Sequence, residues 1–365
     1  MRFFKRIDLS LLIGLAFFIS FGIMMVYSAS FPYATIRFED TEYYFHRQLF
    51  WAGLGFLLLI LAMIIPYKVY RKLVPILIML TMILLFLVLV PHVGVERNFS
   101  TRWISIGGIL FQPVELAKVT MLIYFAYFYS RKEEYIDNFK KGVAPPLIIL
   151  AIVFALILKQ PDLGSSILIV FSCGMILFFT KIPFRHLFLL MMTAVIGVLF
   201  FAITSPYRLE RITSFIAPFD DMEDSGYQLI NSYISISTGG ITGLGLGNSV
   251  QKLGYLPEAH TDFIMSIIAE ELGFIGVLLV IGFYFFFFTR GLLIARRAAD
   301  SFGKLLAFGI TFQIITQAFI NLGAVLGFLP ITGIPLPFVS YGGSSLVIMM
   351  ISAGILLNIS YRKVP

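Results

Sequence analysis

One segment, LPEAHTDFI at residues 256–264, carries the residues best placed for chemistry. Asp262 stands directly before a long apolar run that predicts a membrane helix, so its carboxylate would lie at the mouth of that helix. There it could accept a proton from a substrate hydroxyl, with His260 as a nearby partner. It could equally complement the positive end of the helix dipole, with Thr261 as the N-cap. The pattern by itself favours neither interpretation.

Two further acids, Glu270 and Glu271, lie about two turns deeper in the same apolar run. A charged carboxylate in hydrocarbon costs at least a few kcal/mol, and such groups usually face a polar interior. We therefore expect at least one of the two to be paired, protonated or lining a cavity.

A second polar cluster stands where the fourth apolar run begins. Glu115 and Lys118 are spaced i, i+3 and share one helical face, just after Arg102 and Gln112. One interpretation is an ion pair that satisfies itself within the helix. The other is a cationic patch for an anionic head group, formed by Arg102 and Lys118.

Other polar or flexible stretches interrupt the apolar runs. They are KQPDLGSS at 159–166, GIPLPFVSYGGSS at 333–345, and a glycine-rich stretch between 239 and 247. Those glycines predict either a flexible loop or a close approach of the backbone to a ligand. No Lys-Ser or Lys-Thr dipeptide follows them at the spacing of a P-loop, so they do not form that phosphate-binding motif. Several interruptions that converge on one face would be more informative than any one of them.

The composition requires a membrane protein. Of the 365 residues, 59% are hydrophobic and only 13% are charged, which no soluble core could accommodate. The net charge of +7 comes from short basic clusters between apolar runs, which argues against a nucleic-acid-binding face. Cys173 is the only cysteine, so an intramolecular disulfide and a cysteine-based metal site are excluded.

Windows of about 17 to 25 mostly apolar residues predict the membrane spans. We expect an all-α polytopic protein in which residues 1–365 form a single integral membrane domain with about ten transmembrane helices. The spans fall near residues 9–30, 46–66, 72–91, 113–130, 144–159, 165–181, 186–204, 263–289, 304–326 and 344–360.

The charges between the spans predict the orientation. With the N-terminus inside, most of the 27 Lys and Arg residues fall on the cytoplasmic side and most of the 20 acidic residues on the other. Both termini are then cytoplasmic, and a large outer loop at 205–262 joins the seventh and eighth helices. A loop of that length is not a passive connection. The polar interruptions all fall on the outer face.

The ordered polar motifs resemble those of the SEDS family of bacterial cell-wall polymerases, named for shape, elongation, division and sporulation. The resemblance covers nearly the whole chain. It is carried by MVYSAS at 25–30, RNFSTRWISIGGILFQPVELAK at 97–118, KQPDLGSS at 159–166, YRLERITSF at 207–215, GYQLINS at 226–232, LPEAHTDFIMSIIAEELGFIG at 256–276 and NLGAVLGFLPITGIPLPFVSYGGSS at 321–345.

This resemblance implies an enzyme, a peptidoglycan glycosyltransferase that polymerises lipid II on the outer face of the bacterial cytoplasmic membrane and releases undecaprenyl diphosphate. It implies a class B penicillin-binding transpeptidase and other division proteins as partners, and no nucleic acid. PEAHTDF and MVYSAS are closer to the division and sporulation type than to the rod-elongation type, so we expect the protein at the division septum.

The resemblance also assigns the site. The family's essential aspartate corresponds to Asp262, which we expect to be the catalytic base. We expect the substrate to be bound by Arg102, Gln112, Glu115, Lys118, Arg208, Arg211, Glu258, His260, Thr261, Glu271, Ser340 and Gly342. No motif indicates a metal site, and assistance by a divalent cation, Mg²⁺ or Mn²⁺, stays open.

Rival interpretations belong to other classes of protein. A flippase for lipid-linked precursors would line a path across the membrane with the intramembrane residues Glu115, Lys118, Glu270 and Glu271. Alternating access often leaves repeated halves, and the sequence has no such repeat. A scaffold that only recruits division proteins would leave the polar outer motifs without a role, and an elongation-type polymerase is the alternative within the family.

Overall fold

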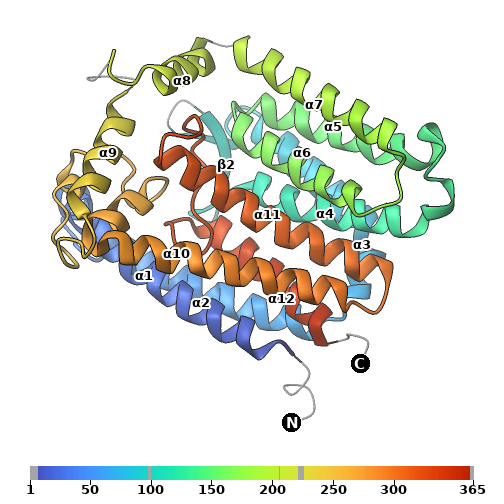
Figure 1. Ribbon diagram of the computed structural model, residues 1–365, viewed down its shortest axis with the longest axis horizontal. Coiled ribbons are helices and arrows are strands. Elements are labelled where there is room, and N and C mark those ends of the chain that lie inside the picture. Colours follow the sequence, from blue (N-terminus) through green and yellow to red (C-terminus); the bar gives the residue numbers. More distant parts are fainter. Residues whose placement is uncertain (1–6, 98–99, 205, 221–225, 362–365) are drawn as a thin grey trace.

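The structure is a computed structural model that describes residues 7–97, 100–204, 206–220 and 226–361. Each predicted apolar window corresponds to one long helix (Figure 1). These helices are α1 (Leu9–Phe38), α2 (Tyr43–Ile64), α3 (Tyr67–Val88), α4 (Pro113–Arg131), α5 (Ala144–Leu158), α6 (Leu163–Phe178), α7 (Phe184–Ile203), α10 (Ile264–Arg296), α11 (Ser301–Val325) and α12 (Gly343–Tyr361). The expected all-α polytopic fold is confirmed.

Eight of the helices in the described ranges are long and apolar enough to cross a membrane. Of the remaining two, α6 has only 16 residues, and α4 carries Glu115 and Lys118 in its first turns. Both pack inside the bundle, because α4 lies against α3 and α11, and α6 lies against α11. The number of spans stays a prediction.

The most buried spans are α11 and α12, so they form the centre of the bundle. Helix α12 packs closely along α2, since a Cβ at Gly354 would lie 2.4 Å from the carbonyl oxygen of Leu59. Small residues allow such close contact between membrane helices. Helix α7, by contrast, has almost no buried residues and lies at the edge, where it contacts α6 and α8.

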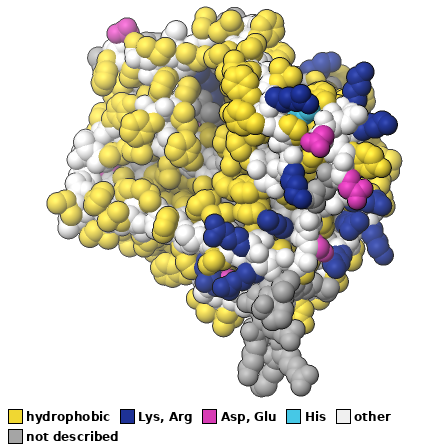
Figure 2. Space-filling model, turned by 45° about the vertical axis from the view of Figure 1, so that its right-hand side comes forward, with side chains coloured by type: hydrophobic (Ala, Val, Ile, Leu, Met, Phe, Trp, Pro, Cys, Tyr) yellow, Lys and Arg dark blue, Asp and Glu magenta, His cyan; other side chains and the backbone are white. Residues whose placement is uncertain are grey.

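The first and last described helices meet at one end of the bundle. The Asp8 backbone N–H donates to Ser360 Oγ at 3.1 Å, and Arg290 near the end of α10 forms an ion pair with Asp8 at 2.6 Å. Figure 2 shows Lys and Arg side chains gathered over this part of the molecule, beside a surface covered by hydrophobic side chains. This asymmetry supports the prediction that this end is cytoplasmic, and we call the opposite end the outer end.

The connections at the outer end are more structured than expected. Three strands form an antiparallel sheet in the order β1 (Gly94–Arg97), β2 (Ser100–Ile106) and β3 (Ile109–Phe111). Gly107 and Gly108, both with positive φ, make the turn from β2 to β3, as a two-residue hairpin requires. The hairpin lies between the third and fourth predicted spans, and the Gly-Gly pair was its signal in the sequence.

The long outer loop also contains regular structure. It forms α8 (Pro206–Ile216), α9 (Tyr227–Gly239) and a 3₁₀ turn, η3 (Gln251–Leu253). The connection between α4 and α5 contains a 3₁₀ turn, η1 (Glu133–Tyr135), and a short π-helix, η2 (Phe139–Val143). Helix α9 packs against α10, so the outer segment is attached to the bundle along this helix.

Candidate active site

Asp262 lies in the loop that leads into α10 at the outer end. The N-cap of α10 is Phe263, which makes no capping hydrogen bond through its side chain. Thr261 Oγ1 donates instead to Glu258 Oε2 at 2.6 Å, so the interpretation of Thr261 as the N-cap is wrong. The Asp262 carboxylate is half-buried, and within the described ranges it makes no hydrogen bond. It is free to accept a proton.

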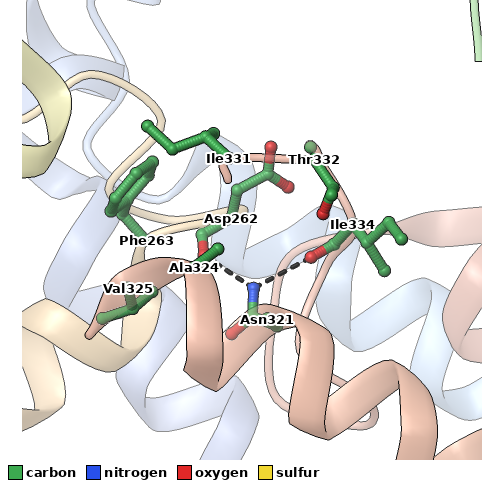
Figure 3. Close-up of a pocket in the computed structure, with 9 residues that line it drawn as sticks. Asp262, Phe263, Asn321, Ala324, Val325, Ile331, Thr332 and Ile334 are labelled. Carbon is green, nitrogen blue, oxygen red and sulfur yellow. Dashed lines mark hydrogen bonds between the residues drawn. The ribbon is translucent and has the colours of Figure 1, made fainter. Parts of the chain in front are cut away.

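The backbone of this loop is held by α11. Asn321 Nδ2 donates to the carbonyl oxygens of Asp262 at 2.7 Å and Ile334 at 2.8 Å (Figure 3). The Asp262 carboxylate points away from Asn321, towards the segment that carries Ile331 and Thr332. It lines a small pocket, formed by Asp262, Phe263, Asn321, Ala324, Val325, Ile331, Thr332, Gly333 and Ile334.

A second set of bonds ties the loop to residues 339–342. Ser340 Oγ donates to the Thr261 carbonyl oxygen at 2.6 Å, and the Tyr341 N–H donates to the His260 carbonyl oxygen at 2.9 Å. Gly342 accepts the bond from Leu346 in the first turn of α12. The predicted residues Ser340 and Gly342 thus lie beside the Asp262 loop. The Ser340 hydroxyl holds the backbone of that loop at Thr261.

The His260 side chain in this loop is buried among tyrosine rings. Its ring lies 4.4 Å from Tyr44, 5.6 Å from Tyr33 and 5.8 Å from Tyr341, measured between ring centroids. Burial lowers the pKa of His260 to about 4, although the nearby Glu258 carboxylate opposes this shift. His260 is therefore neutral at neutral pH.

Charged groups from four segments surround Asp262. Burial raises the pKa of its carboxyl to about 7, and the charge of Glu258 adds to the increase. Arg211 on α8 and Arg102 on β2 lower it, and Asp162 before α6 raises it. A carboxyl with a pKa near neutrality suits a general base, because it gains a proton readily and still ionises at pH 7.

The two arginines are oriented by backbone carbonyls. Arg102 donates through Nε to the Gln160 carbonyl oxygen at 3.4 Å and through Nη2 to that of Pro161, and its Nη1 lies 3.9 Å from Asp162 Oδ2. Arg211 Nη1 donates to the Ile331 carbonyl oxygen at 2.8 Å. Of the predicted polar interruptions, residues 160–162 contact Arg102, and the stretch at 333–345 contacts the Asp262 loop through Ser340. The side chain of Arg208 lies outside the described residues.

Gln112 links the sheet to α12 at the same end. Its backbone N–H donates to Ser344 Oγ at 3.2 Å, and that hydroxyl donates to the Leu110 carbonyl oxygen at 3.2 Å. This contact is structural and leaves the predicted substrate role of the Gln112 side chain untested.

The remaining predicted residues carry charged side chains that form ion pairs inside the protein. Lys118 Nζ lies 2.7 Å from Glu115 Oε2 and donates to Gln317 Oε1 at 3.1 Å, with both charged side chains buried. Glu271 forms an equally buried ion pair with Lys252 at 2.6 Å. None of these side chains lines the Asp262 pocket. Their contact with substrate stays a prediction.

The structure adds residues that the sequence interpretation did not select. Asn321, Thr332 and Gly333 lie beside Asp262, and Lys252 neutralises Glu271. An amide inside an apolar helix, as at Asn321, was a signal that something polar faces it. Across the described part of the chain, no group of three or more His, Cys, Asp or Glu side chains is arranged to hold a metal ion.

Comparison with known proteins now identifies the family. The sequence profile of the cell cycle proteins FtsW, RodA and SpoVE matches residues 9–364. The chain belongs to this family. It is 40% identical over 362 residues, 99% of both chains, to a protein from Geobacter sp. strain M18 named probable peptidoglycan glycosyltransferase FtsW.

Other members of the FtsW/RodA/SpoVE family extend the comparison. Stage V sporulation protein E of Bacillus subtilis strain 168 is 40% identical over 353 residues, 97% of this chain and 96% of that protein. A solved structure of a peptidoglycan synthase complex aligns with a TM-score of 0.80 at 29% identity, covering 97% of both chains. The rod shape determining protein RodA of Thermus thermophilus aligns with a TM-score of 0.70 at 25% identity, covering 98% of this chain and 97% of that one.

Proposed function

We propose that this protein is a peptidoglycan glycosyltransferase that polymerises lipid II at the outer end of the bundle. Family membership and the activity named for the Geobacter relative support the class of reaction. The observation that carries the proposal is Asp262, a carboxylate with no hydrogen bond in the described structure, a raised pKa and two arginines nearby.

The reaction requires a base and a leaving group. Asp262 takes the proton from the acceptor sugar hydroxyl, whose oxygen forms the new bond to the anomeric carbon of a second lipid-linked sugar. The bond from that carbon to the diphosphate oxygen breaks, and undecaprenyl diphosphate leaves with the electron pair. Arg102 and Arg211 stabilise its negative charge, since guanidinium groups bind phosphate oxygens well.

A single base is sufficient for this displacement. Hydrolases of glycosides use a second carboxyl group to protonate the leaving oxygen, whereas a diphosphate leaves without that help. Displacement of an α-linked diphosphate from the opposite side inverts the anomeric centre and gives a β-linked glycan. This scheme uses only groups of the chain itself.

The proposal includes a partner and a location. We infer a class B penicillin-binding transpeptidase as partner, because the aligned peptidoglycan synthase complex coordinates polymerisation and crosslinking. We place the protein at the division septum or in spore-wall synthesis, in keeping with the FtsW and sporulation relatives.

Purified protein with its transpeptidase partner and labelled lipid II in detergent tests the proposal. In detergent there is no bilayer that separates two compartments, so flipping cannot be detected and only polymerisation gives a product. We expect β-linked glycan chains and free undecaprenyl diphosphate. If no chains form with any transpeptidase, while labelled precursor crosses a bilayer in reconstituted vesicles, the flippase alternative replaces the polymerase.

The polymerisation rate is expected to rise with pH through a midpoint near 7. Asp262 acts as a base only when ionised, and its raised pKa means that the ionised fraction falls about tenfold per pH unit below 7. Initial rates between pH 5 and 9 at lipid II concentrations well below KM would measure kcat/KM, whose midpoint reports the free protein. A flat profile down to pH 5 would contradict a base with this pKa.

Glu258→Gln is expected to move that midpoint to lower pH. The Glu258 charge is the largest electrostatic contribution that raises the Asp262 pKa after burial, and its removal makes ionisation of Asp262 easier. Glu39→Gln, an exposed acid that follows α1, serves as the matched control and leaves the midpoint unchanged. An upward shift in Glu258→Gln would contradict the assignment.

A further inference from the structure

Helix α10 is broken two to three turns after it begins. Gly273 has φ 62° and ψ −157°, a backbone conformation far from helical, so the helix divides into an outer part, residues 264–272, and a longer inner part. The outer part directly follows Asp262. Its orientation is therefore not fixed by the inner helix alone.

Residues 239–245, which we call the glycine strap, lie against this break. On the outer side, the N–H groups of Leu244 and Gly245 donate to the carbonyl oxygens of residues 270 and 271 at 3.0 and 2.9 Å. On the inner side, the N–H groups of residues 274 and 275 donate to the carbonyl oxygens of Gly240 and Ile241 at 3.0 and 3.4 Å. The strap thus supplies partners for groups that the break removes from the helical ladder.

The strap needs glycine because its backbone touches the backbone of α10. A Cβ at Gly239 would lie 1.9 Å from the Ala269 carbonyl oxygen, and one at Gly243 would lie 2.1 Å from that of Glu271. Gly243 also has a positive φ of 78°. Gly239 and Gly243 thus serve close approach to a helix, a structural contact in place of the expected flexible loop or ligand contact at these two positions.

Glu270 fastens the segments on either side of the strap to α10. Its carboxylate accepts hydrogen bonds from Ser235 Oγ at 2.8 Å, from Ser249 Oγ at 2.5 Å and from the Val250 N–H at 2.9 Å. Ser235 belongs to α9, before the strap, and the other two follow it. One carboxylate therefore holds both ends.

Glu271 fastens a third element. It forms the fully buried ion pair with Lys252 at 2.6 Å, and Ser28 Oγ of α1 donates to its carboxylate at 2.7 Å. Lys252 Nζ also donates to Ser28 Oγ at 3.1 Å. Removing one partner of such a buried pair leaves an uncompensated charge, so the three groups depend on one another.

We propose that Lys252, with the glycine strap and the Glu270–Glu271 pair, is a positioning element that sets the orientation of residues 264–272 and so places Asp262. The proposal rests on the proposed function, because it treats Asp262 as the base. Lys252 acts through Glu271 and does not line the Asp262 pocket. The outer segment thereby controls the geometry of the active site from a distance.

Lys252→Met tests this role in the full-length protein with its transpeptidase partner and labelled lipid II. We expect kcat to fall at least about tenfold with KM changed less than about twofold, since misplacement of a base affects the chemical step. We also expect the pH midpoint to fall below the wild-type value, because a displaced Asp262 is less buried. The neutral double variant Lys252→Met/Glu271→Gln is expected to regain most of kcat and the wild-type midpoint.

Two controls make the result decisive. Leu253→Ala, an exposed neighbour of Lys252, is expected to change neither kcat nor the midpoint. Gly243→Ala is expected to reproduce the Lys252→Met effects without altering any charge. A lower kcat with an unchanged midpoint in both variants would overturn the proposal and leave a structural role alone.

The parallel Asp262→Asn variant separates this inference from the proposed function. Inactive Asp262→Asn together with wild-type kcat and midpoint in Lys252→Met overturns the positioning role alone. Full activity in Asp262→Asn overturns the assignment of the base, and the positioning role with it. Melting temperatures of all variants, measured in the same detergent, separate loss of fold from loss of geometry.

Discussion

Asp262→Asn is expected to lower the rate of glycan polymerisation by about 10²- to 10⁴-fold, the usual contribution of a general base. The amide cannot accept the proton of the sugar hydroxyl. Asn is nearly the same size as Asp, and the Asp262 carboxylate makes no hydrogen bond in the described structure, so the substitution removes no contact. Initial rates of labelled lipid II polymerisation with the transpeptidase present measure the effect.

Two comparisons show that such a loss is chemical. The backbone contact from Asn321 to the Asp262 carbonyl oxygen is kept in Asp262→Asn, so the melting temperature should not fall. Asp262→Glu, which keeps the carboxylate but displaces it, should retain more activity than the amide. Retention of more than about a tenth of wild-type activity by Asp262→Asn would contradict a base that supplies the usual effect.

Lys118→Met is expected to destabilise the protein by about 3–5 kcal/mol, the cost of breaking a buried ion pair. The substitution leaves Glu115 without its cation and Gln317 Oε1 without its donor, both in the buried interior between α4 and α11. Thermal unfolding in detergent should show a clearly lower melting temperature. A variant as stable as the wild type would contradict the pairing.

The double variant Glu115→Gln/Lys118→Met decides between the two interpretations of this pair. With no buried charge left, its melting temperature should return most of the way to the wild-type value. If Lys118 only balances Glu115, polymerisation should return with it. A stable double variant that stays inactive would assign Lys118 to the substrate diphosphate.

Much of the site could be predicted from the sequence because its parts are local. The position of Asp262 before an apolar run left it equally suited to a proton acceptor and to a helix-dipole role, and the family resemblance assigned it as the base, with Arg102, Arg211 and Ser340 among the expected substrate-binding residues. The structure brings these residues to one end of the bundle. Their substrate roles stay predictions.

The interpretation was less successful where the partner of a group lies far away in the chain. At least one of Glu270 and Glu271 was expected to be paired, protonated or lining a cavity, but the sequence did not indicate that the partners of Glu271 are Lys252 and Ser28 on α1. Its contact with substrate stays a prediction. The glycines at 239–247 were interpreted as a flexible loop or a ligand contact, whereas Gly239 and Gly243 approach the backbone of the broken helix α10. A sequence pattern carries no information about which distant backbone a glycine approaches.

Hydropathy and charge determined the long apolar helices and the end at which the polar groups gather. Burial in lipid imposes a minimum length on each apolar run and an uneven distribution of basic residues between the two sides, and both can be read directly from a membrane-protein sequence. Only the tertiary structure decided which polar groups satisfy one another. It showed that Thr261 is not an N-cap, that Glu115 and Glu271 are paired in the interior, and that Asp262 has no such partner in the described structure. The physical reason is that hydrogen bonds and ion pairs depend on distances of a few ångströms between segments far apart in the chain.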